Sequence, residues 1–422
     1  MSKMFSSEHQ YLNEWTFLGA NTRISTHCYH DYPARMIPQV ADQLIGLYGS
    51  TATTLYDPYC GTGTTLVEGF AKGINVIGTD LNPLARLIAK SKTMLVSIEK
   101  LDTHIKEFSL FLLGNEVEVP LIDSIRGIPN LEYWFKPHVI HTLTRIKQYI
   151  GTIENEAVKT FFLVAFSETV RESSNTRNGE FKIYRYAPEK LENFNPEPRM
   201  IMLKKLDRNR AGLLQFTKLV DNLPRVPTSH VYSVNSVYGI PEQLIPTGSV
   251  NIVVTSPPYG DSQTTVAYGQ YSRFSAAWLG LPDPHRIDQT LMGASKNITT
   301  YELPCSELNS AISEIKSRDK NRGLEVFSFY TDLFSSIVNV SKTIARGGYA
   351  CYVVGNRTVK SVTLPTDLAI QGFFEDAGFR HVTTHTRDIP NKRMPSRNSP
   401  TNEAGKTEVT MTKEYIVVMQ NP

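Results

Sequence analysis

Short apolar runs alternate with segments of helical spacing along most of the chain. Such runs predict strands at residues 53–56, 74–79, 230–234, 250–254, 349–354 and 414–419, and residues 381–386 are predicted to form one more strand. Helical spacing of apolar positions marks residues 40–47, 66–71, 138–150, 155–170, 323–345 and 368–377. The pair Gly347 and Gly348 is expected to stop the helix that begins near residue 323. Because strands that alternate with helices form parallel sheets, we predict an α/β fold with a seven-stranded, mainly parallel sheet.

Residues 101–225 differ from the rest of the chain because they show helical spacing and no strand pattern. We therefore predict that residues 1–100 form the first part of an α/β domain, 101–225 a largely helical insertion, and 226–422 the second part of the domain. The last two strands are expected to pair across a long basic loop, residues 387–413. This loop and the stretch 171–185 can contact phosphates and base edges, but a solvated surface has the same composition.

Composition narrows the possible functions only moderately. The chain has 422 residues and 41% of them are hydrophobic, enough for one large domain with an insertion. Its formal net charge is only +3, so nucleic-acid binding requires local basic patches. The cysteines have no short pair spacing, and His27 and His30 lack further ligands nearby, so we expect no metal site and a reducing compartment. Without an apolar leader or a run of about 18 apolar residues, we expect a cytoplasmic protein that has no membrane contact.

A glycine turn followed by an acid connects the first two predicted strands. The turn has the sequence DPYCGTGTT, residues 57–65. Gly61 and Gly63 let the backbone turn tightly and approach a ligand, and the next helix begins with free N–H groups. Asp80 ends the second strand about 20 residues later, a spacing that suits binding of a ribose diol. An ordinary turn between a strand and a helix is the alternative.

A second candidate site follows the predicted strand 250–254, in the sequence TSPPYG, residues 255–260. Two consecutive prolines hold the backbone extended and leave nearby carbonyl groups free to accept hydrogen bonds. Ser256 adds a side-chain acceptor and Tyr259 a flat apolar face. Such a loop can hold a planar group that carries an exocyclic amine, for example a nucleobase turned out of its stack. A proline turn that only closes the strand is the alternative.

Four polar side chains fall at the ends of predicted strands: Asp57, Asp80, Asn235 and Ser256. Ligands of parallel sheets bind beyond the carboxyl ends of the strands. We therefore expect these side chains to form one site, with an acid for a ribose, an amide for an adenine edge and a rigid pocket for an amine-bearing base.

These motifs together resemble the S-adenosylmethionine-dependent amino-methyltransferases of DNA. The sequence DPYCGTGTT is similar to their cofactor motif, DLNP to the segment with the ribose-binding acid, and HDYPARMIPQ to a segment beside the cofactor. The sequence TSPPYG resembles their catalytic motif in the serine form associated with cytosine N4 methylation. Asn235 is a departure, because the family often has Asp there. The resemblance implies a Rossmann-like methyltransferase fold, with the insertion as the candidate target-recognition region.

The resemblance also implies roles for individual residues. The expected catalytic residues are Ser256, Pro257, Pro258 and Tyr259. The residues expected to bind S-adenosylmethionine are Tyr32, Asp57, Tyr59, Gly61, Gly63, Thr64, Asp80, Asn82 and Asn235. The candidates for contact with double-stranded DNA are Arg177, Arg185, Arg273, Lys392, Arg393 and Arg397.

The implied reaction is direct methyl transfer to the N4 amine of a flipped cytosine, with residues 261–273 as a mobile loop over the substrate. A cognate restriction endonuclease can act on the same DNA site without direct contact. Alternatives are an adenine-N6 DNA methyltransferase and a guanine-N2 tRNA methyltransferase, although the latter usually has an N-terminal RNA-binding domain. A dinucleotide-binding oxidoreductase leaves TSPPYG unexplained, and a non-catalytic DNA-binding subunit needs a decayed cofactor site, whereas this one is intact.

Overall fold

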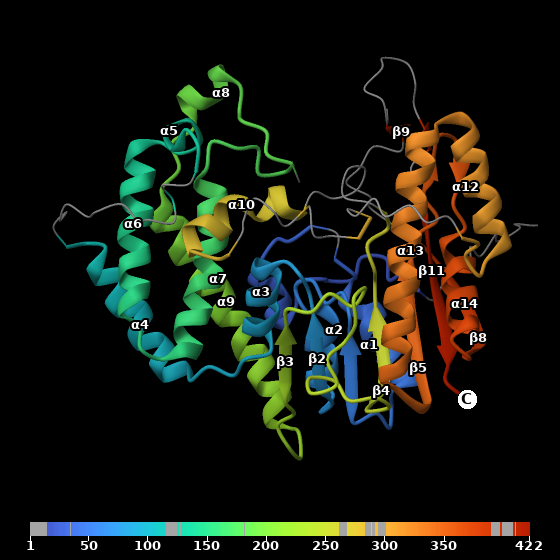
Figure 1. Cartoon of the computed structure of the whole chain (residues 1–422). Coiled ribbons are helices and arrows are strands. Elements are labelled where there is room, and N and C mark those ends of the chain that lie inside the picture. Colours follow the sequence, from blue (N-terminus) through green and yellow to red (C-terminus); the bar gives the residue numbers. More distant parts are fainter. Residues whose placement is uncertain are drawn as a thin grey trace, which may run out of the picture.

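The centre of the molecule is a seven-stranded sheet in the order β3-β2-β1-β4-β5-β11-β8 (Figure 1). The computed structural model describes residues 15–33, 35–114, 125, 128–180, 182–260, 268–282, 288, 292–293, 301–389, 397–398, 408–409 and 411–422. Strands β3, β2, β1, β4 and β5 pair in parallel, and β11 runs antiparallel to both β5 and β8. The predicted α/β fold with a mainly parallel sheet is therefore confirmed.

The strands form where the apolar runs predicted them. Their bounds are Thr54–Asp57 (β1), Asn75–Thr79 (β2), Ser229–Tyr232 (β3), Val250–Thr255 (β4), Ile344–Val354 (β5), Arg380–Asp388 (β8) and Lys413–Gln420 (β11). Strands β1 and β4 are almost wholly buried, because helices cover both faces of the sheet. Strands β1 and β4 therefore read as nearly continuous apolar runs and not as a regular alternation of apolar and polar residues.

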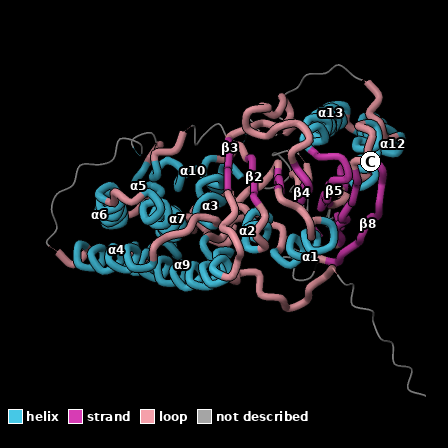
Figure 2. Tube along the Cα trace, turned by 90° about the horizontal axis from the view of Figure 1, so that it is seen from below, coloured by secondary structure: helices cyan, strands magenta, loops and turns pink. Residues whose placement is uncertain are grey.

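Helices lie on both faces of the sheet (Figure 2), and alternate side chains of the strands belong to two different cores. Leu55 and Ile252 pack against α1 (Pro38–Tyr48), α2 (Thr64–Ala71) and the end of α9 (Pro198–Asp221). Tyr56 and Val253 pack on the other face, against α12 (Ser306–Arg318), α13 (Lys320–Thr343) and α14 (Thr366–Asp376). This two-sided burial leaves the ends of the strands as the place where polar side chains can gather.

The expected helix stop at Gly347 and Gly348 is wrong. Helix α13 already ends at Thr343, and both glycines lie inside strand β5. Val250 pairs with Ile344 whereas Ile252 pairs with Tyr349, so the residues between these partners form a bulge in the strand. Gly347 has a φ of +80°, a conformation that glycine adopts at little cost, and this explains the glycine within a strand.

Helices predominate in the described part of residues 98–221, beyond the β3 edge of the sheet (Figures 1 and 2). They are α4 (Ile98–Phe111), α5 (Leu131–Trp134), α6 (Pro137–Thr152), α7 (Glu156–Ser173), α8 (Pro188–Asn193) and α9. Their apolar faces share a core that also includes residues of α3 (Pro83–Lys92) and of α10 (Tyr268–Leu279). A short 3-10 helix, Ser25–Tyr29, lies on α9, where a side chain at Gly212 would overlap the carbonyl oxygen of Ser25.

Two segments expected to be loops contain regular structure. Residues 268–273 of the expected mobile loop belong to α10, because Tyr271 and Phe274 bury their rings in the core of the helical region. Residues 261–267 lie outside the described residues. Within residues 387–413, β8 continues to Asp388, and β9 (Arg397–Asn398) pairs with β10 (Glu408–Val409). A further small pair is β6 (Thr358–Val359) with β7 (Val362–Thr363). Within the described ranges, the structure contains no helix long and apolar enough to cross a membrane.

Candidate active site

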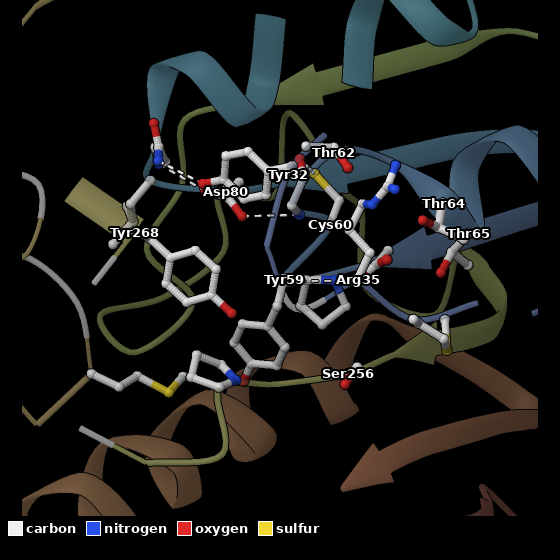
Figure 3. A pocket seen from close by; sticks show the side chains of 18 of the residues that line it. Tyr32, Arg35, Tyr59, Cys60, Thr62, Thr64, Thr65, Asp80, Ser256 and Tyr268 are labelled. Carbon is white, nitrogen blue, oxygen red and sulfur yellow. Dashed lines mark hydrogen bonds between the residues drawn. The ribbon is translucent and has the colours of Figure 1, made fainter. Parts of the chain in front are cut away.

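A cavity opens at the carboxyl ends of β1, β2 and β4, where three distant segments of the chain meet (Figure 3). Its lining includes ten of the thirteen residues predicted to be catalytic or to bind the cofactor: Tyr32, Asp57, Tyr59, Gly61, Thr64, Asp80, Asn82, Asn235, Ser256 and Pro258. Gly63, Pro257 and Tyr259 adjoin these residues in the chain but do not line the cavity. The four strand-end residues that were predicted to share one site therefore all line this cavity.

The glycine turn forms the floor of the cavity at the start of α2. Gly61 and Gly63 have φ angles of +48° and +77°, so both occupy the left-handed region that favours glycine. A β-carbon on Gly63 would lie 2.9 Å from the β-carbon of Ala89 on α3, whereas one on Gly61 would meet no atom within 4 Å. No side chain caps the N-terminus of α2, so its first N–H groups remain available to a ligand.

The Asp80 carboxylate is held in place by two backbone N–H groups. Gly61 N donates to Oδ2 at 3.0 Å and Asn82 N donates to Oδ1 at 2.7 Å (Figure 3). Burial raises the pKa of Asp80, while these two hydrogen bonds oppose the rise. The Asn82 amide donates to the Tyr32 hydroxyl at 2.7 Å and to Ser272 Oγ at 2.8 Å. Asn82 therefore orients the wall of the cavity and connects it to α10.

Aromatic rings form a large part of the cavity wall. The rings of Tyr32 and Tyr268 are stacked with their centroids 5.9 Å apart. The Tyr59 hydroxyl lies 2.5 Å from Ser336 Oγ on α13, so its ring, and not its polar end, is left to contact a ligand. Burial raises the pKa of Tyr59. The Asn235 side-chain oxygen accepts from Val237 N at 3.0 Å, which leaves its NH2 group free to donate.

Asp57 connects the glycine turn to the second motif. Its Oδ1 accepts from Thr255 Oγ1 at 2.6 Å and from Tyr59 N at 3.1 Å. Thr255 is the last residue of β4 and directly precedes Ser256, so this hydrogen bond joins segments that are 198 residues apart. Burial raises the pKa of Asp57 to about 6.

The polar ends of Ser256 and Tyr259, both in the second motif, lie close together beside the cavity. Ser256 lines the cavity and donates from Oγ to the Tyr259 hydroxyl at 3.3 Å, which is long for a hydrogen bond between hydroxyl groups. Tyr259 does not line the cavity and donates to Glu414 Oε1 at 2.8 Å. Glu414 in turn accepts at Oε2 from Arg387 Nη1 at 2.8 Å. Sequence reasoning missed Glu414 and Arg387, because no motif marks them and only the pairing of β8 with β11 brings them here.

Arg35 is another residue of the cavity that the sequence did not single out. It lines the cavity and donates from Nη1 to the carbonyl oxygens of His27 and His30 at 3.2 and 3.1 Å. His27 Nε2 lies 2.6 Å from Glu68 Oε1, and His30 is 1% exposed. Among the described residues, no group of three His, Cys, Asp or Glu side chains is placed to hold a metal ion.

The three described arginines predicted to contact DNA lie outside this cavity. Arg177 is exposed, and the Arg185 guanidinium lies 4.0 Å above the centre of the Tyr133 ring. Arg273 on α10 lines a separate hollow. The other residues of that hollow are Ile128, Pro129, Asn130, Tyr133, Trp134, Ile183 and Phe274.

The remaining candidates for DNA contact belong to the long basic segment. Lys392 and Arg393 lie outside the described residues. The backbone of Arg397 belongs to β9. Their contact with DNA stays a prediction.

Two known methyltransferases are similar to this chain over most of its length. No protein-family model matches the chain. The type II methyltransferase M.MvaI of Kocuria varians is 41% identical over 441 aligned residues, which cover 100% of this chain and 96% of that protein. M.BsoBI of Geobacillus stearothermophilus, also a type II methyltransferase, is 21% identical over an alignment of 423 positions, gaps included. That alignment covers 87% of this chain and 81% of M.BsoBI.

Similarity to solved structures is low. An rRNA methyltransferase, AviRa from Streptomyces viridochromogenes, is 9% identical and has a TM-score of 0.35, with 93% of this chain and 88% of that one covered. This likeness is too weak to support an argument, whereas the match to M.MvaI extends over the whole chain. The chain therefore belongs to the type II methyltransferase family, and its methyl donor is S-adenosylmethionine.

Proposed function

We propose that this protein transfers a methyl group from S-adenosylmethionine to the exocyclic N4 amine of cytosine at a specific site in double-stranded DNA. The main support is that Asp57, Asp80 and Ser256 line one cavity and that a hydrogen bond joins Asp57 to the residue before Ser256. Membership of the type II methyltransferase family supports DNA as the substrate.

The residues on one side of the cavity fit the groups of S-adenosylmethionine. The Asp80 carboxylate is rigidly held and can accept from the two ribose hydroxyls. The uncapped N-terminus of α2 suits a carboxylate, and the free amide NH2 of Asn235 can donate to an adenine nitrogen. Asp57 supplies a negative charge for the cationic groups of the ligand. When bound, S-adenosylmethionine supplies an electrophilic methyl group on its sulfonium.

The residues on the other side fit a base that carries an amine. The amine of cytosine is a poor nucleophile because its lone pair is delocalised into the ring. Hydrogen bonds from the NH2 group to Ser256 Oγ and to the Pro257 carbonyl localise that lone pair and aim it at the methyl group. Pro258 lines the cavity and offers a flat apolar surface for the ring, whereas the Tyr259 ring lies outside the lining.

Loss of the proton does not require Ser256 to act as a base. The amine becomes strongly acidic once it has gained the methyl group, so the proton can leave to water or to a nearby acceptor. The base has to leave the duplex to reach the cavity. We propose that Arg177 and Arg185 bind the DNA from the helical insertion, Arg273 from α10, and Lys392, Arg393 and Arg397 from the segment 387–413. A cognate restriction endonuclease would act on the same DNA site without direct contact.

The choice of cytosine rests on Ser256, the first residue of the SPPY sequence, and adenine N6 is the alternative target. Ser256 lies at the cavity wall, so its hydroxyl oxygen is within reach of a ligand, and this favours a base that carries an amine. This position alone suits either base, so the product has to be identified directly.

Substitutions on the two sides of the cavity test which residues bind the cofactor and which act on the target base. Ser256→Ala is expected to lose methylation of DNA by roughly 100-fold or more while it binds S-adenosylmethionine as the wild type does. Asp80→Ala is expected to weaken cofactor binding, because it removes the acceptor for the ribose. Calorimetric titration gives the dissociation constant, and transfer of a labelled methyl group to DNA gives the rate. Wild-type turnover by Ser256→Ala contradicts the proposal, and an unchanged dissociation constant in Asp80→Ala contradicts the role of Asp80.

A further inference from the structure

We propose that Glu414, held by Arg387, is a positioning residue that sets the direction of a hydrogen-bond chain, so that Ser256 presents its lone pairs to the target amine. This inference rests on the proposed function and extends the site to the last two strands. The chain of side chains runs from Ser256 through Tyr259 to Glu414 and Arg387.

The two outer members of the chain come from neighbouring strands. Glu414 on β11 and Arg387 on β8 face each other directly in the antiparallel register. Their side chains are 14% and 6% exposed, so the ion pair is largely shielded from water. Glu414 uses one oxygen for each partner, Oε1 for Tyr259 and Oε2 for Arg387. This arrangement fixes the carboxylate relative to the end of β4.

The direction of the chain follows from what each group can donate. An ionised carboxylate only accepts hydrogen bonds, and a guanidinium only donates them. The Tyr259 proton therefore points to Glu414, and burial, followed by the nearby charge of Glu414, raises the pKa of Tyr259 so that the hydroxyl keeps this proton. The Tyr259 oxygen is then left to accept from Ser256. With its own proton directed to Tyr259, Ser256 Oγ keeps its lone pairs for the N–H of a base in the cavity.

Packing around the Tyr259 ring keeps its hydroxyl between Ser256 and Glu414. A β-carbon on Gly355, at the end of β5, would lie 3.3 Å from Tyr259 Cδ2 and would overlap the side chain of Met411. Gly355 thus leaves room for the Tyr259 ring beside the end of β5. The same packing accounts for the absence of Tyr259 from the cavity lining.

The substitution Glu414→Gln tests the direction of the chain with little change in shape. Arg387 needs an acceptor, so the amide oxygen takes the position of Oε2 and the NH2 group faces Tyr259. Tyr259 must then accept from this amide and donate to Ser256. The Ser256 proton then points toward the target base. There it either meets the N–H of the target amine or donates to the amine lone pair that should attack the methyl group. We expect kcat to fall roughly 100-fold, with no change in the KM for DNA or in the dissociation constant for S-adenosylmethionine.

A double-mutant cycle separates this effect from a general loss of structure. Tyr259→Phe breaks the chain and is expected to lower kcat by about tenfold, because the Ser256 proton is no longer directed. Added to Tyr259→Phe, Glu414→Gln should have no further effect, because no hydroxyl remains to transmit it. Glu325→Gln is the matched control: it neutralises the half-buried pair of Glu325 with Arg322, whose side chains are 22% and 11% exposed, and it should leave kcat unchanged.

Thermal melting of every variant identifies any loss of folding. If Glu414→Gln fails to fold, Tyr259→Phe probes the same chain, and wild-type kcat in that variant contradicts the inference. The inference is also overturned if Glu414→Gln keeps the wild-type kcat, or if it loses the same factor with Tyr259 absent. A wild-type protein that methylates no DNA base contradicts the proposed function itself, which distinguishes the two failures.

Discussion

Asp57 shows how a single residue can serve both structure and chemistry. Its carboxylate is 4% exposed, joins β1 to β4 through Thr255, and lines the cavity. Burial raises its pKa from 3.8 to about 6. A raised carboxyl pKa favours the protonated form in the folded protein, so the stability that Asp57 contributes is present below about pH 4 and is lost as the pH rises through about 6.

The same shift predicts that cofactor affinity depends on pH. S-adenosylmethionine carries cationic groups, which favour the ionised carboxylate of Asp57. We therefore expect its dissociation constant to fall by up to about tenfold between about pH 5 and about pH 7. In Asp57→Asn, which keeps an acceptor for Thr255, this dependence should largely disappear. Calorimetric titration across this range provides the measurement, and an equally steep dependence in Asp57→Asn contradicts the assignment.

At the scale of elements, the sequence was sufficient where local pattern and burial agree. Strands β1, β2 and β4 are apolar runs covered on both faces, and their ends carry Asp57, Asp80 and Ser256, so both the strands and the shared site were predictable. Contacts that depend on tertiary pairing were not predictable. The position of Glu414 beside Tyr259 requires the register of β8 against β11, and no local pattern specifies that register.

Errors in the sequence prediction have the same physical origin. The glycines 347 and 348 resemble a helix stop, but the pairing of β4 with β5 places them in a bulge. Polar residues before Phe274 resemble a loop, yet α10 forms there because Tyr271 and Phe274 bury their rings against the helical region. In both cases tertiary packing overrode a local signal.

The start of α2 gives a prediction at the scale of an element. Gly63→Ala forces alanine into the left-handed region and places its β-carbon 2.9 Å from that of Ala89. We expect the free energy of unfolding to fall by about 1–3 kcal/mol. Gly61→Ala, where a β-carbon meets no atom within 4 Å, should cost less stability. Urea denaturation compares the two variants, and equal losses contradict the importance of the contact between α2 and α3.

At the scale of the whole molecule, the cavity lies at the carboxyl ends of the strands, and the helical region lies beyond the β3 edge of the sheet (Figure 1). Helix α10 connects the two parts. Its Tyr268 lines the cavity, its Ser272 accepts from Asn82, and its Phe274 belongs to the core of the helical region. Helix α10 thus connects the insertion, which we propose binds the DNA, to the cavity that we propose is the catalytic site.

This arrangement predicts that the insertion binds phosphates of the DNA backbone. Arg177→Ala and Arg185→Ala should weaken DNA binding, and each should reduce the slope of log K against log salt by about 0.9 for every phosphate that the arginine neutralises in the wild type. Arg225 is exposed and precedes β3, so it lies at the opposite end of the strands and Arg225→Ala serves as the control. Fluorescence anisotropy at several salt concentrations measures the slopes. Unchanged slopes in both insertion variants contradict a role of these arginines at the DNA.

The most direct test of the account is the identity of the methylated base. Duplex DNA incubated with the wild-type protein and isotopically labelled S-adenosylmethionine can be digested to nucleosides and analysed by mass spectrometry, with Ser256→Ala as the control. We predict labelled N4-methylcytosine from the wild type and roughly 100-fold less of it, or lower still, from Ser256→Ala over the same time. Label found only in N6-methyladenine contradicts the target, and label absent from DNA contradicts the proposed function.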